Sequence, residues 1–171
     1  FTIGVRCYWT INLLMNNESV TIRIYKEGDF EQVWELHEKA LKAAGAFVAG
    51  HGEWDEDLKD IPGVYLKTGG TFLVVEKDGK IIGMGALKKI SNKVVEIKRM
   101  RVLPEFQGRG LGTKLLKILE ERASELGYTR LVLDTTVKQE AAIHLYQKFG
   151  YREFKRGMLG GLETIWMEKE L

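Results

Sequence analysis

Residues 102–113 read Val102-Leu-Pro-Glu-Phe-Gln107-Gly108-Arg109-Gly110-Leu111-Gly112-Thr113, and they join a strand-like segment to a helix-like one. Glycines at such a junction let the backbone turn tightly and let a ligand approach the main chain. The first amides of the helix have no partner within it, and the helix dipole adds partial positive charge. The stretch predicts an anion site suited to a pyrophosphate. A flexible glycine loop before an ordinary helix is the alternative interpretation.

The glycine spacing separates this loop from two common nucleotide motifs. A P-loop requires Gly, four residues and then Gly-Lys-Ser/Thr, which is absent, and a dinucleotide fingerprint requires Gly-x-Gly-x-x-Gly. Here Gly108, Gly110 and Gly112 are spaced Gly-x-Gly-x-Gly. Asp134 stands where a ribose-binding acid would be expected, but the strand before the loop carries several charged residues and is not the buried strand of that fold. A nucleotide-binding oxidoreductase fragment is therefore disfavoured.

The segments before the loop alternate apolar and polar residues with the period of strands. Val20–Tyr25 predicts one strand. Asp78-Gly79, between apolar runs at 71–76 and 80–87, predicts a hairpin with a type I′ turn. Residues 94–102 follow as the third strand of an antiparallel meander. In the N-terminal half, one helix is expected to end near Gly45, and a shorter one is expected over 54–61 before Pro62-Gly63 breaks it.

The segments after the loop predict a crossover between parallel strands. A helix over 111–126 ends at Gly127, and 131–134 is a short buried strand. A strand, helix and strand in this order form a right-handed βαβ unit. A helix over 139–149 and two strands near 151–156 and 163–170 complete the chain. We therefore predict an α+β fold with a mixed, mostly antiparallel central sheet flanked by helices and a βαβ core.

Composition narrows the class of protein. The 171 residues suffice for one domain, and a net charge of +2 does not favour nucleic acid or an anionic membrane as partner. No apolar run reaches the roughly 18 residues of a membrane span. The lone Cys7 excludes an intrachain disulfide and suits a reducing, cytoplasmic location. The three histidines have no metal-ligand spacing, so no metal is expected.

The chain begins at Phe1, and residues 1–14 are interpreted as a leader or a mis-called start, with Met15 as the natural initiator and 15–171 as one domain. A cut signal peptide is a weaker interpretation, and a genuine extra strand is a further alternative.

Several motifs together resemble the GNAT family of N-acetyltransferases. Gln107-Gly-Arg-Gly110-Leu-Gly112 is similar to the family signature Arg/Gln-x-x-Gly-x-Gly/Ala, and Val102-Leu-Pro104 resembles its lead-in. Ala142-Ile-His-Leu-Tyr146-Gln-Lys-Phe-Gly150-Tyr151 resembles the family's Ala-x-x-Leu-Tyr-x-x-x-Gly-Phe segment, and Met167–Leu171 resembles its closing strand. The resemblance covers about residues 21–171. The chain departs from the family at Gln139, where members often have Asn, and this puts the cofactor contact of Gln139 in question.

The resemblance implies transfer of an acetyl group from acetyl-CoA to an amine by direct attack in a ternary complex. It implies that the pyrophosphate binds at the loop and that a bulged strand offers backbone groups to the pantetheine and acetyl oxygen. The expected cofactor-binding residues are Met100, Arg101, Val102, Gln107, Gly108, Arg109, Gly110, Leu111, Gly112, Thr113 and Gln139. Dimers are common among relatives, which leaves a homodimer open. A non-catalytic acyl-CoA-binding or sensing module on the same scaffold is the alternative function.

Two residues are the candidates for catalysis. Val95-Glu96-Ile97 resembles the segment in members that use the glutamate as a base, commonly through water, and a carboxylate enclosed by a sheet would have a raised pKa. The alternative is a solvent-facing Glu96 paired with a lysine. By family analogy, Tyr146 lies beside the CoA sulfur and protonates it; core packing is its alternative role.

The acceptor is expected to be selected by the segment from Ala43 to Tyr65. It contains aromatic residues and the acids Glu53, Asp55, Glu56 and Asp57, which could attract a positively charged amine. The alternative is that these residues only pack helices and solvate a surface.

Overall fold

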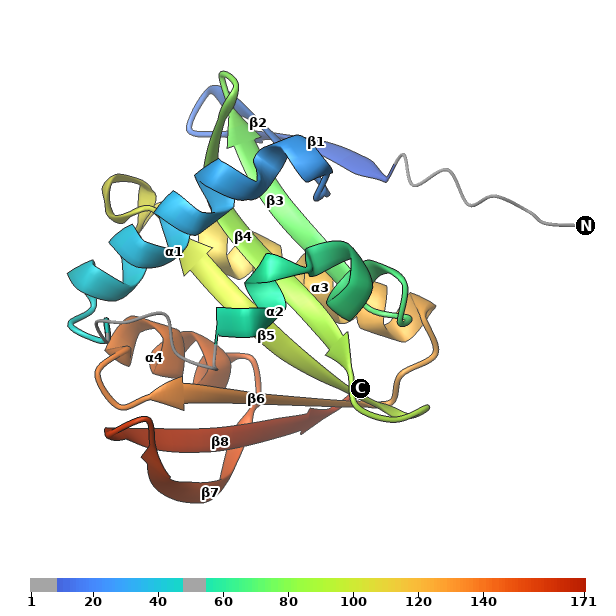
Figure 1. Cartoon of the computed structure of the whole chain (residues 1–171), viewed down its shortest axis with the longest axis vertical. Helices are drawn as coiled ribbons and strands as arrows, with labels where there is room; N and C mark the ends of the chain where they lie inside the picture. Colours follow the sequence, from blue (N-terminus) through green and yellow to red (C-terminus); the bar gives the residue numbers. More distant parts are fainter. Residues whose placement is uncertain (1–8, 48–54) are drawn as a thin grey trace, which may run out of the picture.

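The computed structural model describes residues 9–47 and 55–171, which form one eight-stranded sheet with helices on both faces (Figure 1). The strands lie in the order β1-β2-β3-β4-β5-β6-β8-β7. Neighbouring strands are antiparallel except β5 and β6, which run parallel. The predicted α+β class with a mixed, mostly antiparallel sheet is confirmed.

The strands of the sheet are β1 (Thr10–Met15), β2 (Glu18–Ile24), β3 (Thr71–Lys77), β4 (Lys80–Lys89), β5 (Val94–Val102), β6 (Arg130–Thr136), β7 (Arg152–Leu159) and β8 (Leu162–Glu170). The helices are α1 (Phe30–Ala43), α2 (Glu56–Lys59), α3 (Leu111–Glu125) and α4 (Glu140–Lys148). Short 3-10 turns occupy Glu27–Asp29 and Pro104–Phe106, and a π-helical turn occupies Pro62–Leu66.

The central strands are covered from both sides. Helices α1 and α2 lie on one face of the sheet and α3 lies behind it (Figure 1). Strand β4 is buried almost throughout because α1 and α3 both pack against it. Gly85 of β4 shows how closely α3 approaches, since a Cβ there would lie 2.9 Å from the Leu119 side chain. The sheet is therefore a rigid middle layer on which residues of both faces can be positioned.

The first hairpin extends the sheet at its N-terminal edge. Strand β1 pairs with β2 from Thr10↔Arg23 to Met15↔Glu18. Asn16 and Asn17 form the turn, both with positive φ, which Asn tolerates better than most residues. Residues 10–14 thus form part of the extra strand left open by the sequence. The assignment of 1–14 to a leader stays a prediction, and residues 1–8 lie outside the described part.

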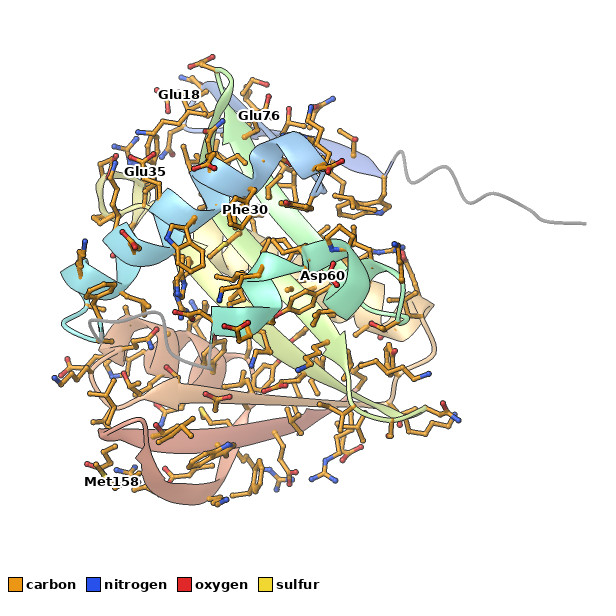
Figure 2. All side chains as sticks on the ribbon, viewed as in Figure 1. Glu18, Phe30, Glu35, Asp60, Glu76 and Met158 are labelled. Carbon is orange, nitrogen blue, oxygen red and sulfur yellow. The ribbon has the colours of Figure 1, made fainter. Side chains whose placement is uncertain are left out.

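The meander and crossover follow the sequence pattern. Asp78 and Gly79 have φ of 50° and 77°, as a type I′ turn requires, and β2 to β5 pair in succession. Helix α3 connects β5 to the parallel β6. The last hairpin then folds back so that β8 lies between β6 and β7. Strand β7 is consequently an edge, and its Met158 is 68% exposed at the rim of the molecule (Figure 2).

The prediction that Pro62-Gly63 ends a helix over 54–61 was wrong in part. Helix α2 spans only Glu56–Lys59, and Pro62 begins the next helical turn instead of terminating one. Proline is tolerated at the first turn of a helix because the N–H it lacks has no helical acceptor there. This turn brings Tyr65, which is fully buried, against Phe72 of β3. Trp54 lies outside the described residues.

Candidate active site

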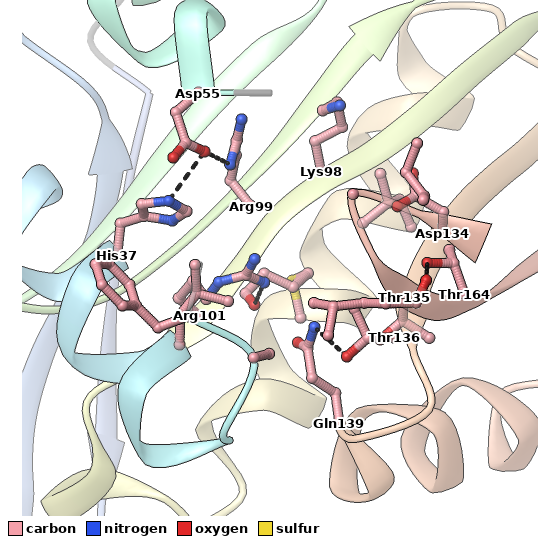
Figure 3. A pocket seen from close by; sticks show the side chains of 18 of the residues that line it. His37, Asp55, Lys98, Arg99, Arg101, Asp134, Thr135, Thr136, Gln139 and Thr164 are labelled. Atoms are coloured by element: carbon pink, nitrogen blue, oxygen red, sulfur yellow. Dashed lines mark hydrogen bonds and ion pairs between the residues drawn. The ribbon is translucent and has the colours of Figure 1, made fainter. Parts of the chain in front are cut away.

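The parallel strands β5 and β6 separate after a short stretch of pairing. Their register runs from Val94↔Arg130 to Glu96↔Val132 and then ceases. Beyond this point a cavity of about 240 Å³ lies between them, lined by residues 97–101 of β5 and 134–136 of β6 (Figure 3). Residues from α1, from the N-cap of α2, from α4 and from the β7–β8 turn complete its wall. The cavity is therefore reached by residues from both faces of the sheet.

A β-bulge interrupts β5 beside the cavity. The register shifts where Gly85 of β4 faces both Arg99 and Met100. Arg99 has a φ of 59°, in the left-handed region that non-glycine residues rarely adopt. A bulge leaves one residue unpaired and re-aims the strand, so backbone groups here are freed from the ladder. The bulge was expected at 100–102; it begins one residue earlier, and Met100 and Arg101 both line the cavity.

Arg99 is held by two aspartates from the α2 segment. Its Nε donates to Asp57 Oδ2 at 3.0 Å, and its Nη1 donates to Asp55 Oδ1 at 3.0 Å. Its Nη2 and the Tyr65 hydroxyl also donate to Asp57. Burial alone would raise the pKa of Asp57, but the hydrogen bonds and charge of Arg99 lower it. These contacts bind the α2 segment to the bulge of β5.

These contacts give the acidic segment a structural role beside the expected one, and its selection of the acceptor stays a prediction. Asp55 and Asp57 were expected to attract a cationic acceptor, but both carboxylates are bound to Arg99 within the protein. Glu56 pairs with Lys59 on the surface, and Glu53 lies outside the described residues. Phe47 and Asp55 do line the cavity, as the expectation that this segment contributes to the site required. Its aspartates, however, neutralise a protein cation.

His37 of α1 lies beside this network. It is 2% exposed, and its Nε2 lies 3.1 Å from Asp55 Oδ1 (Figure 3). Burial, together with the charges of Arg101 and Arg99, lowers the pKa of His37 to about 4, against the opposing effect of Asp55. The ring is therefore neutral near pH 7. Its Nδ1 has no hydrogen-bond partner among the described residues.

Tyr146 of α4 faces the same cavity. It is 5% exposed, and its ring meets that of Tyr151 edge-on, with centroids 5.6 Å apart. Burial raises the pKa of Tyr146 to about 12, although Arg101 acts in the opposite direction. The hydroxyl consequently stays protonated near neutral pH. Both interpretations made from the sequence, a packed core residue and a proton donor at the site, are compatible with this position.

Glu96 lies just outside the residues that line the cavity. It is half-buried, and its Oε1 is 3.9 Å from Lys98 Nζ. Burial raises the pKa of Glu96, Asp134 raises it further, and Lys98 opposes them. Asp134, which the sequence analysis considered only as a ribose ligand, does line the cavity. Glu96 thus has both the raised pKa and the lysine partner that the sequence offered as alternatives.

The glycine loop follows β5 and leads into α3. Gly108 and Gly110 have φ of 71° and 81°, and Gly110 is the N-cap of α3. Residues 107–110 are exposed. Gln107 donates through Nε2 to the Val102 carbonyl at 3.0 Å, which ties the loop to the end of β5. Arg109 donates to the Glu105 carbonyl and stacks over Phe106. The first amides of α3, at Leu111, Gly112 and Thr113, are left for an outside acceptor by helix geometry.

Gln139 lies at the N-cap of α4 and lines the cavity. Its Nε2 is 3.5 Å from the Thr136 hydroxyl at the end of β6. The structure therefore brings Gln139, Tyr146, Met100 and Arg101 together around one cavity, while the loop over 107–113 continues from the strand that forms its wall.

The comparisons with known proteins agree with this geometry. A family model described as "Acetyltransferase (GNAT) family" matches residues 28–151. The chain belongs to this family. Uncharacterized N-acetyltransferase YjgM of Escherichia coli (strain K12) is 32% identical over 128 residues, covering 71% of this chain and 77% of that protein. N-acetyltransferase family 8 member 2 of Rattus norvegicus is 33% identical over 102 residues, 57% of this chain but only 45% of that one, so the chain spans less than half of that relative.

The fold is also that of GNAT proteins of known structure. The structure of yncA from Salmonella typhimurium, described as an acetyltransferase with its cofactor acetyl-CoA, superposes with a TM-score of 0.73 over 88% of this chain and 93% of that one, at 24% identity. The GNAT resemblance identified from the loop and from residues 142–151 is thus confirmed, and the predicted fold with it. The assigned roles of individual residues stay predictions.

Several residues of this GNAT site carried no signal in the sequence. Lys98, Thr135, Thr136 and the β7–β8 turn line the cavity, yet none belongs to a recognised motif. His37 carried no signal either, and Asp134 was considered only as a ribose ligand. Over residues 9–47 and 55–171, no group of three His, Cys, Asp or Glu side chains could hold a metal ion. In the same part of the chain, no helix is long and apolar enough to cross a membrane.

The low pKa of His37 predicts a loss of stability in mild acid. The His37 ring takes up a proton near pH 6.5 in the unfolded chain but only near pH 4 in the folded protein. The contribution of His37 to the free energy of unfolding is therefore complete above pH 6.5 and is lost as the pH falls from 6.5 to 4. The difference corresponds to a free energy of unfolding on the order of 3 kcal/mol. His37→Gln should lose less stability between pH 6.5 and 4 in urea titrations. His144→Gln, at an exposed position, is the control, and equal slopes in both variants would contradict the prediction.

Proposed function

We propose that the chain is an acetyl-CoA-dependent N-acetyltransferase that transfers an acetyl group to a primary amine by direct attack in a ternary complex. The observation that carries the proposal is the cavity at the separation of β5 and β6, which has a bulge on one wall and a protonated tyrosine on another. The relative yncA, named with acetyl-CoA as its cofactor, supports the choice of acyl donor.

The chain's own residues fit such a donor. The exposed loop over 107–113 offers main-chain amides and the positive end of α3 to a pyrophosphate. Val102 and the bulged residues before it offer backbone groups along β5. A fold that lacked Gly108 and Gly110 at positive φ would not present these amides, because other residues rarely adopt that conformation.

Bound acetyl-CoA would supply the acetyl group as a thioester. The uncharged amine nitrogen forms a bond to the acetyl carbon, the carbon–sulfur bond breaks, and the sulfur leaves with the bonding electrons. The amine must first lose the proton of its ammonium form, and the nitrogen loses a second proton once it is bonded to the acetyl carbon. The sulfur takes up one proton, so one proton is released overall and Tyr146 is reprotonated by the second. The Tyr146 hydroxyl, which burial keeps protonated, is the donor we propose for the sulfur. Glu96, through water, is the proposed acceptor of the amine proton.

The loop assignment predicts that Gly110→Val weakens acetyl-CoA binding at least tenfold in calorimetry. A β-branched residue is strained at the φ of 81° and would displace the amides that follow. Gly127→Val is a matched control, since Gly127 has a φ of 87° at the other end of α3. Both variants should lose similar stability, and only Gly110→Val should lose affinity. Equal affinities would show that the pyrophosphate binds elsewhere.

The function itself is tested by acetyl-CoA turnover across a panel of amines, with CoA release followed spectroscopically and products identified by mass spectrometry. We expect Tyr146→Phe to lower kcat about 10- to 100-fold with little change in acetyl-CoA affinity, because the thiolate develops only in the transition state. An unchanged kcat across the pH range would show that Tyr146 only packs in the core. Binding of acetyl-CoA without turnover of any amine would instead favour a non-catalytic acyl-CoA sensor.

The proposed base predicts a change in the pH–rate profile. Glu96 accepts a proton only when ionised, so kcat/KM should fall as the pH drops through its raised pKa. Glu96→Gln should remove this acidic limb. Asp134→Asn is the matched comparison, because Asp134 raises the pKa of Glu96 and lies on the cavity wall. A limb that persists in Glu96→Gln and vanishes in Asp134→Asn would assign the base to Asp134.

A further inference from the structure

Arg101 places a cation in the cavity without an ion-pair partner. Its Nη1 donates to the Met100 carbonyl at 2.8 Å, and its buried Nε has no hydrogen-bond partner among the described residues. Across residues 9–47 and 55–171, no carboxylate lies within ion-pair distance of this guanidinium. Figure 3 shows Arg101 below His37, on the cavity side of β5.

The other charged groups of the cavity already have partners. Arg99 is bound to Asp55 and Asp57, and Lys98 lies near Glu96. His37 is held neutral by burial and by the two arginines, so it adds no charge of its own. Asp134 and Asp55 lie on the same cavity wall and favour the charged form of Arg101, but neither is within ion-pair distance of it. Within the described residues, Arg101 is therefore the lining cation without an ion-pair partner.

A buried cation without an ion-pair partner is stabilised when an anion binds beside it. Burial and the charge of Arg99 lower the pKa of Arg101 to about 10, against the more distant Asp134 and Asp55, and this still leaves it protonated near neutral pH. Burying a charged side chain away from water costs desolvation free energy. A carboxylate that is hydrogen-bonded to the charge offsets that cost. A guanidinium also matches a carboxylate with two parallel hydrogen bonds. The electrostatics of the empty site thus favour an anionic group of the substrate.

We infer that the acceptor is a small amine that also bears a carboxylate, such as a free amino acid, and that the Arg101 side chain binds this carboxylate. The inference rests on the proposed function and specifies its acceptor. It replaces the cationic acceptor expected from the sequence, since the aspartates of that expectation are bound to Arg99. The backbone of Arg101 remains free to serve the acyl donor, as proposed for β5.

The rest of the wall suits an apolar substituent. Leu41, Ala46 and Phe47 on one side and Leu159 and Leu162 on the other line the cavity without charge. A volume of about 240 Å³ is at the lower end for small-molecule sites. An amino acid with an apolar side chain therefore fits better than a polyamine, which would bring a second cation next to Arg101.

The test compares acceptors that differ only in the carboxylate: leucine, leucinamide and 3-methylbutylamine, each with saturating acetyl-CoA. The amide has the less basic amino group, so amine chemistry alone would favour it. We expect kcat/KM for leucine to exceed that for leucinamide at least tenfold, with the difference mainly in KM. Comparable values for the two acceptors would overturn the inference and leave the proposed function standing, whereas no turnover of any amine would count against the proposed function.

Arg101→Met tests the residue. It should abolish the preference for leucine by raising its KM about 10- to 100-fold, as expected for a lost charge-assisted hydrogen-bonded pair. Values for leucinamide should change little, and Arg101→Lys should restore part of the preference. Arg152→Met, which removes an exposed charge on edge strand β7, is the control and should behave as wild type.

Two measurements exclude other roles of Arg101. Calorimetry with acetyl-CoA should give the same affinity for Arg101→Met and wild type; a lost affinity would place the side chain in the donor site and overturn the inference. A kcat lowered equally for leucine and leucinamide would place it at the reacting carbonyl, with the same consequence.

Binding of the acetylated products gives a readout that is independent of turnover. In the presence of CoA, wild type should bind N-acetylleucine more tightly than N-acetylleucinamide, and Arg101→Met should show no such preference.

Discussion

Arg99 adopts a left-handed backbone conformation in the middle of β5, and the carboxylates of Asp55 and Asp57 hold its guanidinium from the α2 side. A strained residue persists only where its surroundings over-determine it. Here the bulge lies just beyond the point where β5 and β6 cease to pair, and the freed backbone groups and the position of Arg101 depend on it. Because breaking a buried ion pair leaves an unpaired charge, the network resists the loss of either partner and keeps the bulge in place.

The same network distributes charge within the site. Arg99 forms ion pairs with both aspartates, whereas the neighbouring Arg101 has no ion-pair partner among the described residues. Burial and the two cations together keep His37 neutral. Two carboxylates that looked available to a substrate along the chain are therefore bound to one guanidinium in the folded protein. The two arginines, two residues apart, thus differ in role: Arg99 holds the α2 segment, and Arg101 is the residue that we propose binds the ligand.

The two faces of the sheet contribute different groups to the site. The glycine loop and α3 belong to the βαβ unit, where main-chain amides meet a helix terminus. Helix α1 and the N-cap of α2 bring side chains to the opposite face, and α4 supplies Tyr146 at the gap between the strands. Under the proposed function, the backbone of the loop and of β5 would bind the acyl donor and side chains would bind the acceptor, so the acceptor wall could change on an unchanged scaffold.

Local signals in the sequence determined much of the fold. Asp78-Gly79 favours a tight turn because both residues tolerate positive φ, and the glycines of the loop adopt positive φ for the same reason. The strand–helix–strand order predicts a right-handed crossover between parallel strands. The cavity residues Tyr146 and Gln139 could be found through the family motifs. The partners of Arg99 could not, because Asp57 and Asp55 are 42 and 44 residues away and their charges looked equally available to solvent or substrate. Only the tertiary structure decided which charges pair, on which side of β5 the Arg101 side chain lies, and that Glu96 lies outside the cavity wall. These features depend on distances between elements that are far apart in the sequence, and no local pattern encodes such distances.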